Sequence, residues 1–157
     1  MIRAAGPPDD RRLAEIDLLT WSPLSSPAAR PDPGGAFFVH GLVPDNVLVA
    51  EIQGAVGGYV ALGRATRLAS NAHVLAIHGL AVAPEHQGRG IGRRLLRAAI
   101  DEARARGARR LTLRVLGHNL PARGLYEAAG FRIEGVLCGE FLIGGRYVDD
   151  VLMALGL

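Results

Sequence analysis

The chain has 157 residues, 49% of them hydrophobic and 21% charged, proportions typical of one globular domain and unlike those of a disordered chain. Its apolar runs are too short to cross a bilayer, its N-terminus lacks the layout of a signal peptide, and its single cysteine excludes an internal disulfide. We therefore expect residues 1–157 to form a single domain of a soluble, cytoplasmic protein. The formal net charge of +3 comes from arginines alone, which reflects either genome base composition or a polyanionic partner.

The first expected helix follows an extended start and ends near Trp21. Prolines and Asp9 precede it, and Leu13 and Ile16 lie on one apolar stripe. Prolines and glycines then interrupt regular structure over about residues 22–36. Irregular stretches of this length often act as mobile lids or substrate loops, and a plain surface loop is the alternative.

Alternation and length predict the remaining elements. Strands are expected over 46–52, 55–62 and 73–82, a helix over 91–106, a strand over 111–116, a helix over 119–129, and a final hairpin of 131–143 with 147–155. Glycines end both helices and form the turns. The order strand, helix, three strands, helix, strand, helix, two strands predicts an α/β domain with a mixed sheet.

The segment Gln87-Gly88-Arg89-Gly90-Ile91-Gly92 lies between a buried strand and the clearest helix. Alternate glycines let the backbone turn tightly and direct its N–H groups into one concavity at the positive end of the helix dipole. Arg89 and Arg93 can add guanidinium groups there. The ligand that this arrangement favours is a pyrophosphate.

Two common phosphate-binding loops do not fit this segment. A Walker loop needs a lysine after its last glycine, and the chain contains no lysine. A dinucleotide-binding loop needs a glycine five positions after Gly88, where this chain has Arg93. A third class of phosphate loop remains, and an ordinary surface loop is the alternative.

Several motifs in the same order and spacing resemble the GNAT superfamily of N-acetyltransferases. They are His78 to Pro84, Gln87 to Gly92, Leu95-Leu96, Asn119, Leu125-Tyr126-Glu127 and Gly130-Phe131. The resemblance covers about residues 73–155, whereas the first 70 residues match only in their order of elements. It implies the GNAT fold, with a mixed, mostly antiparallel sheet of six or seven strands and helices on both faces.

The resemblance also implies a set of residues that bind acetyl-CoA as co-substrate. The loop Gln87, Gly88, Arg89, Gly90, Ile91 and Gly92, together with Arg93, takes the pyrophosphate, and the strand residues Leu80, Ala81 and Val82 offer backbone groups to the pantetheine arm. The Val82 N–H would polarise the thioester carbonyl. Asn119, Ala122 and Tyr126 complete this set, and the Tyr126 hydroxyl would protonate the departing thiolate.

The acceptor amine must lose a proton, so a base is needed directly or through water. His78, on the strand that lines the family's active site, is a candidate because an imidazole can accept a proton near neutral pH, and a buried structural histidine is the alternative. Glu140, Asp149 and Asp150 on the last hairpin could instead bind or deprotonate the amine, and solvent-exposed carboxylates are the alternative. Alternation along the hairpin requires Asp149 or Asp150 to point inward.

Other residues carry weaker signals. Cys138 lacks a base in register and is expected to be inert. His73, His86 and His118 do not have the spacing of a metal site, so no metal is expected. The arginines Arg104, Arg106, Arg109 and Arg110 form a basic cluster, which is either a solvated surface, a contact for the coenzyme's 3′-phosphate, or a nucleic-acid patch that lacks interleaved aromatics.

Three functions remain open at this stage. The first is an N-acetyltransferase that moves acetyl from acetyl-CoA to a primary amine by direct transfer with both substrates bound. The second is a non-catalytic acyl-CoA-binding module, and the third is a nucleic-acid binder. We expect neither a nucleic acid nor a membrane as partner, and the resemblance makes a homodimer possible. The acceptor, whether a small molecule, a polyamine or a protein N-terminus, does not follow from the family.

Overall fold

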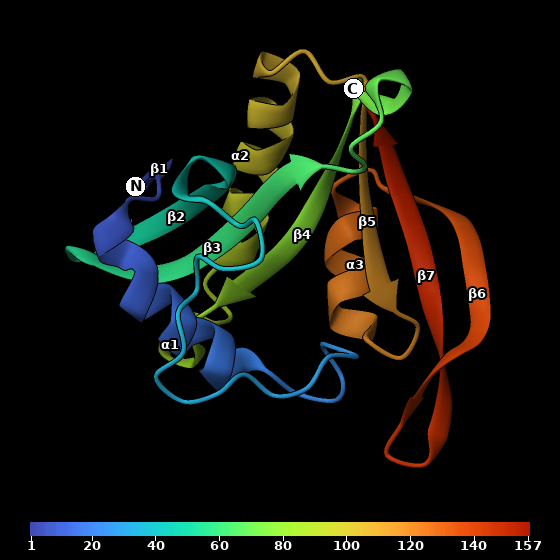
Figure 1. The fold of residues 1–157 in the computed structure, drawn as a ribbon, viewed down its shortest axis with the longest axis horizontal. Helices are drawn as coiled ribbons and strands as arrows, with labels where there is room; N and C mark the ends of the chain where they lie inside the picture. Colours follow the sequence, from blue (N-terminus) through green and yellow to red (C-terminus); the bar gives the residue numbers. More distant parts are fainter.

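The computed structural model describes residues 1–157 as a seven-stranded sheet, in the order β1-β2-β3-β4-β5-β7-β6, with three α-helices (Figure 1). The elements are β1 (Ile2–Ala4), α1 (Asp10–Thr20), β2 (Val47–Ile52), β3 (Ala55–Arg64), β4 (Val74–Val82), α2 (Ile91–Ala105), β5 (Arg110–Leu116), α3 (Leu120–Ala128), β6 (Arg132–Ile143) and β7 (Arg146–Gly156). Only β4 and β5 pair in parallel. The mixed, mostly antiparallel sheet expected from the sequence is therefore confirmed. No helix has both the length and the apolar character needed to cross a membrane.

The sheet buries a separate apolar core on each face. Strand alternation divides β3 between them, since Val60 belongs to the core that includes α2, whereas Tyr59 belongs to the core that includes α1. Phe37 reaches the second core from the long loop after α1 and packs edge-to-face on Tyr59, with ring centroids 4.8 Å apart. The helices thus cover both faces, and the long loop joins α1 in covering one of them (Figure 1).

Helix α2 packs closely on the sheet because β3 carries a glycine beneath it. A Cβ added at Gly58 would lie 2.9 Å from the Ala81 carbonyl oxygen and 3.2 Å from Leu95 Cδ1. Leu95 and Leu96 are fully buried, and the opposite face of the helix carries exposed arginines. This amphipathic pattern fixes which side of α2 faces the sheet.

Strands β4 and β5 pair over only three residues each, Val74–Ala76 with Arg110–Thr112. Beyond these pairs the two strands separate (Figure 1), and β5 continues its pairing with β7 as far as Leu116. The backbone groups on this side of β4 are therefore not used by the sheet. The separation creates a gap in the middle of an otherwise continuous sheet.

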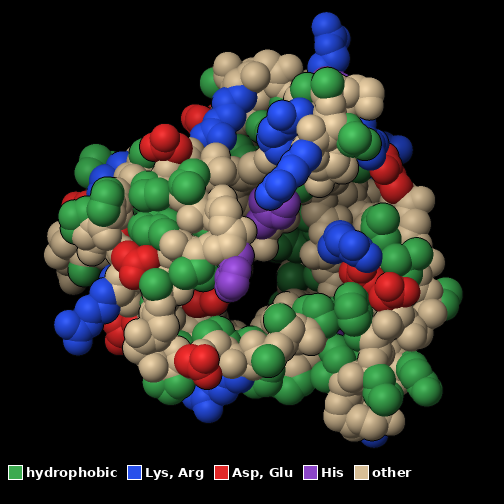
Figure 2. Space-filling model, in the orientation of Figure 1, with side chains coloured by type: hydrophobic (Ala, Val, Ile, Leu, Met, Phe, Trp, Pro, Cys, Tyr) green, Lys and Arg blue, Asp and Glu red, His purple; other side chains and the backbone are tan.

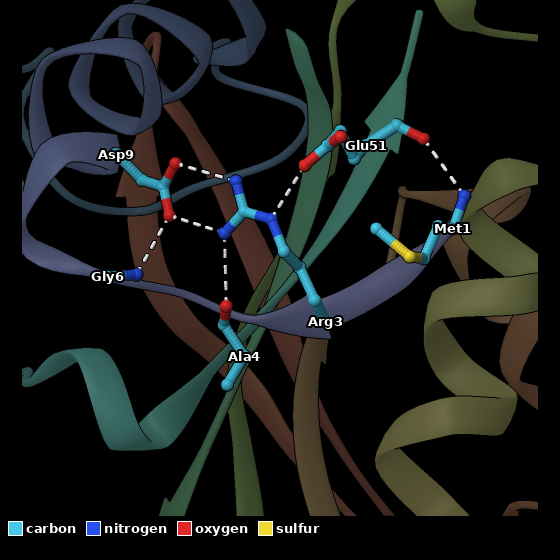
Figure 3. Close-up of polar contacts among 6 residues, drawn as sticks. All are labelled: Met1, Arg3, Ala4, Gly6, Asp9 and Glu51. Atoms are coloured by element: carbon cyan, nitrogen blue, oxygen red, sulfur yellow. Dashed lines mark hydrogen bonds and ion pairs between the residues drawn. The ribbon is translucent and has the colours of Figure 1, made fainter. Parts of the chain in front are cut away.

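Arg3 connects the start of the chain to two other elements (Figure 3). Its guanidinium donates to both carboxylate oxygens of Asp9, at 2.8 and 3.0 Å, and to Glu51 Oε2 at 2.7 Å. Asp9 also accepts the Gly6 N–H at 2.8 Å. Hydrogen bonding from Arg3 lowers the pKa of Asp9. This cluster holds β1, the start of α1 and β2 together.

Candidate functional site

A cavity of about 750 Å³ occupies the gap between the separated strands. Its walls come from the last residues of β4 and β5, from α3, from α1 with the loop after it, and from β6 and β7. The space-filling view shows a deep hollow in this region, with histidine and arginine side chains at its border (Figure 2). The expected site residues that line it are His78, Leu80, Ala81, Val82, Gln87, Asn119, Ala122 and Tyr126.

The backbone of β4 directs two N–H groups into this gap. The Ala83 N–H donates to the Gly57 carbonyl at 2.9 Å, which makes these residues a hydrogen-bonded pair of the antiparallel ladder. Hydrogen-bonded and non-hydrogen-bonded pairs alternate, so the N–H groups of Val82 and Leu80 point away from β3. Because β5 has already separated from β4, these two donors face the cavity and can bind a carbonyl there.

The glycine-rich loop forms the N-terminus of α2, next to one end of the cavity. Gly90 is the N-cap in the left-handed conformation, at φ +75°, and Gly88 has φ +74°, a backbone geometry that glycine adopts without strain. The first N–H groups of α2 have no partner within the helix and carry its positive dipole end. A Cβ on Gly92 would lie 3.7–3.9 Å from side chains of Leu125, Val82 and Leu80, which line the cavity.

Gln87 and Asn119 contact backbone groups at the cavity wall. Gln87 Nε2 donates to the Val82 carbonyl at 3.0 Å, which leaves the Val82 N–H as the group that faces the cavity. Asn119 caps α3, since its Oδ1 accepts the Ala122 N–H at 3.3 Å. Its amide nitrogen makes no hydrogen bond within the chain and can donate into the cavity.

Tyr126 is buried on α3 with its ring packed edge-to-face against Phe131, at a centroid distance of 5.9 Å. Burial raises the pKa of its phenol to about 12, because the ionised form loses solvation. Its hydroxyl makes no hydrogen bond within the chain, although the residue lines the cavity. Tyr126 therefore holds its proton at neutral pH and presents a free donor.

His78 lies at a β-bulge, which sequence patterns did not indicate. Ala61 pairs with Gly79 and Leu62 with Ile77, so His78 is the extra residue on β4 and its side chain is re-aimed. It is exposed rather than buried, so the alternative of a buried structural histidine is wrong. Its Nε2 lies 3.2 Å from the Arg64 carbonyl oxygen. A proton on Nε2 leaves Nδ1 as an acceptor.

The acidic residues of the final hairpin separate into different surroundings. Asp150 is only 3% exposed, lines the cavity and forms an ion pair with Arg114, whose Nε lies 2.6 Å from Asp150 Oδ2. Asp149 faces away and accepts the Gly139 N–H at 2.8 Å, and Glu140 is exposed and absent from the cavity wall. Asp150 is therefore the inward carboxylate, and its charge is already balanced by Arg114.

A second hydrogen-bonded pair in the cavity wall was not anticipated from the sequence. The Tyr59 hydroxyl donates to Asp17 Oδ1 at 2.8 Å, across 42 residues. Both residues line the cavity. Two signals in the sequence could have drawn attention to them, since Asp17 interrupts the apolar stripe of the first helix and Tyr59 carries the only hydroxyl in a buried strand. Neither signal predicts that they meet.

The basic cluster lies away from this site. Arg104 and Arg106 lie at the far end of α2 from Gly90, about 20 Å along a helix of this length. Arg106 and Arg110 are ion-paired with Glu102 and Glu134. The cluster is therefore a partly neutralised surface, which does not favour a nucleic-acid patch. No group of three or more metal-ligating side chains occurs, and Cys138 is exposed on β6.

The sequence is similar to known acetyltransferases. Residues 11–131 match the model of the Acetyltransferase (GNAT) family. The L-amino acid N-acyltransferase MnaT of Escherichia coli (strain K12) is 33% identical over 111 residues, which cover 71% of this chain and 64% of that protein. The chain therefore spans less than two thirds of that relative's length.

Comparisons of the structure extend the similarity to the whole chain. The structure of smu.2055 from Streptococcus mutans UA159 has a TM-score of 0.90 at 26% identity and covers 99% of this chain and 98% of that one. The structure of yncA from Salmonella typhimurium was solved with its cofactor acetyl-CoA. It has a TM-score of 0.83 at 25% identity, and the similarity covers 100% of this chain and 93% of that one. The fold expected from the sequence motifs is confirmed.

Proposed function

Because the chain belongs to the acetyltransferase (GNAT) family, we propose that it transfers acetyl from acetyl-CoA to a primary amine while both are bound. The observation that carries this proposal is the gap between β4 and β5. There the unpaired N–H groups of Leu80 and Val82 and the free hydroxyl of Tyr126 line one cavity of about 750 Å³. The acetyl-CoA bound to the yncA structure supports the same ligand for this chain.

The start of α2 fits the pyrophosphate of acetyl-CoA. Gly88 and Gly90 hold backbone conformations that leave the helix N-terminus open, and a Cβ on Gly88 would meet no atom within 4 Å. The exposed Arg89 and Arg93 can add charge-assisted hydrogen bonds to the phosphates. From this end, the pantetheine arm would follow the N–H groups of β4 toward Tyr126, with Asn119 and Ala122 beside it.

Within this site Val82 and Tyr126 would act on opposite ends of the breaking bond. The amine nitrogen attacks the thioester carbonyl carbon, and the C–S bond breaks with its electron pair moving to sulfur. The Val82 N–H stabilises the negative charge that develops on the carbonyl oxygen. Tyr126 donates a hydrogen bond to the departing sulfur. Its pKa of about 12 exceeds the value of about 8.5 for a typical thiol, so the hydrogen bond stabilises the thiolate. Full protonation of the thiolate by Tyr126, the role that the resemblance implies, would be uphill, and we propose the hydrogen bond in its place.

His78 is the base that the geometry favours. It is exposed at the cavity wall with Nδ1 free when Nε2 donates to the Arg64 carbonyl. The alternative carboxylate, Asp150, is neutralised by Arg114. We therefore assign to His78 Nδ1 the proton that the acceptor nitrogen releases, taken directly or through water.

The experiment that tests this function follows free thiol release from acetyl-CoA with amines of three kinds, namely amino acids, polyamines and a peptide with a free N-terminus. We expect thiol release that depends on at least one amine. Acetyl-CoA binding with no thiol release from any amine would instead support a non-catalytic acyl-CoA-binding module.

A further inference from the structure

A second cavity of about 650 Å³ adjoins the first on the side of α1. The two cavities share Asp17, Tyr59, His78 and Gly79, together with three residues of the loop after α1. Asp17 and His78 therefore lie at the junction of the two spaces. An acceptor that enters through the second cavity must pass these side chains to reach the first cavity, where Val82 and Tyr126 lie.

The Asp17 carboxylate is held in place at this junction but is not neutralised. Its Oδ1 accepts the Tyr59 hydroxyl at 2.8 Å, and its Oδ2 has no hydrogen bond or ion pair within the chain. Tyr59 is 5% exposed and fixed by the Phe37 ring. Burial and the adjacent Asp17 carboxylate raise the pKa of Tyr59 well above its usual value, so the phenol remains a donor. One carboxylate oxygen thus stays free to bind a cation.

The lining of the second cavity is largely apolar, its fixed charges are carboxylates, and its two imidazoles are those of His40 and His78. Phe37, Val39 and Leu42 contribute apolar surface, and Asp17 and Asp32 contribute carboxylates. No arginine lines this space. In the first cavity the guanidinium of Arg114 is ion-paired with Asp150. A carboxylate on the acceptor would therefore meet the negative charges of Asp17 and Asp32 in the second cavity, with no arginine there to offset them.

We propose that Asp17 binds the ammonium group of the acceptor at this junction, and that the second cavity receives an apolar acceptor body that carries no carboxylate. Tyr59 is the positioning residue that orients the Asp17 carboxylate. This inference rests on the proposed function and names the class of amine that it uses. The bound ammonium would then lie beside His78, the group to which we assign its proton.

A matched pair of acceptors tests whether the site disfavours an acceptor that carries a carboxylate. Phenethylamine and L-phenylalanine share the same aromatic body and amine, and differ by the α-carboxylate. In a thiol-release assay we expect kcat/KM to be at least about tenfold higher for phenethylamine, a factor within the range of one charge-assisted contact. A higher value for L-phenylalanine would overturn the proposal.

The variant Asp17→Asn tests the role of the charge, since asparagine can still accept the Tyr59 hydroxyl. We expect KM for phenethylamine to rise about 10- to 100-fold, with the Kd for acetyl-CoA unchanged. The ratio of kcat/KM for phenethylamine to that for L-phenylalanine should also decrease, because the negative charge that repels the α-carboxylate is gone. Tyr59→Phe keeps the ring on Phe37 and should raise KM by a smaller factor while leaving kcat nearly unchanged.

The matched control is Asp101→Asn, which removes an equal charge from the surface of α2, where Asp101 pairs only with Arg104. The same KM in Asp17→Asn and Asp101→Asn would overturn the role of Asp17. Tight acetyl-CoA binding without transfer to either amine would overturn the acceptor class alone. Failure of the wild type to bind acetyl-CoA would instead overturn the proposed function.

Discussion

Tyr126 has two tasks that can be separated by removing a single oxygen atom. Its ring packs on Phe131, and its hydroxyl would contact the departing sulfur. In Tyr126→Phe the packing stays and the donor is lost, so we expect kcat to fall about 100-fold, the loss typical of one preorganised donor. Calorimetry of the variant should give an unchanged Kd for acetyl-CoA. Equal losses in kcat and in binding would mean that the hydroxyl is not used in the transfer step.

The raised pKa of Tyr126 predicts a dependence of stability on alkaline pH. Above about pH 10 the unfolded chain releases this phenolic proton, whereas the folded chain keeps it up to a pKa of about 12. The folded state then binds more protons, so the free energy of unfolding falls as pH rises through this window. Urea unfolding at pH 8 and near pH 11 should show a smaller decrease for Tyr126→Phe than for the wild type. Parallel decreases would contradict the burial of this phenol.

The pattern of local motifs predicts the glycine-rich loop and several residues of the cavity wall. It could not find contacts that depend on tertiary structure. Tyr59 and Asp17 meet across 42 residues, and Arg114 neutralises Asp150 across 36. The pattern of the last hairpin requires one of two aspartates to point inward, but only the burial of Asp150 in the folded chain identifies it. The pairing of charges within the cavity could therefore not be predicted from the sequence.

At the scale of elements, periodicity predicted every helix and every long strand to within about two residues of its observed ends. It did not predict the bulge at His78 or the separation of β4 from β5. A bulge adds one residue to a strand, and the types of residue in the strand do not reveal where it lies. Beyond Thr112, β5 remains paired with β7 alone. Both features arise from pairing between distant segments, and both shape the site.

The cluster around Arg3 offers a test of how the first elements are joined. In Arg3→Met the aliphatic stem remains, and the hydrogen bonds to Asp9 and Glu51 are lost. We expect the free energy of unfolding to fall by about 1–2 kcal/mol at pH 7, a modest value because the site is partly exposed. Urea denaturation curves of both proteins measure this difference.

The difference in the free energy of unfolding between wild type and Arg3→Met should become smaller in acid. Arg3 lowers the pKa of Asp9 below its usual value of 3.8. The stabilisation that this pair gives to the folded chain is therefore complete above about pH 4, and it is lost as the pH falls through the lower pKa that Asp9 has in the folded state. Wild type and Arg3→Met should therefore differ less near pH 2 than at pH 7. A constant difference would show that Asp9 is not the partner that matters.

At the scale of the whole molecule, the fold places the helix N-terminus, the free N–H groups of β4 and the tyrosine along one path through the sheet. The loop after α1 lies on the opposite face from α2 and α3 (Figure 1), so the proposed substrates, acetyl-CoA and the amine, would approach from different sides. The homodimer that the resemblance makes possible remains a prediction, and light scattering on the purified chain would measure the oligomeric state.

The most direct measurement is the calorimetric titration of acetyl-CoA into the wild type, Gly90→Glu and Gly107→Glu. Gly90 and Gly107 lie at opposite ends of α2 with nearly equal φ values of +75° and +79°, so both variants carry similar backbone strain. Only the first places a carboxylate where the pyrophosphate would bind. We expect the wild type and Gly107→Glu to bind tightly and Gly90→Glu to lose binding. Absence of binding in the wild type, or equal binding by the two variants, would contradict the assignment of this site to acetyl-CoA.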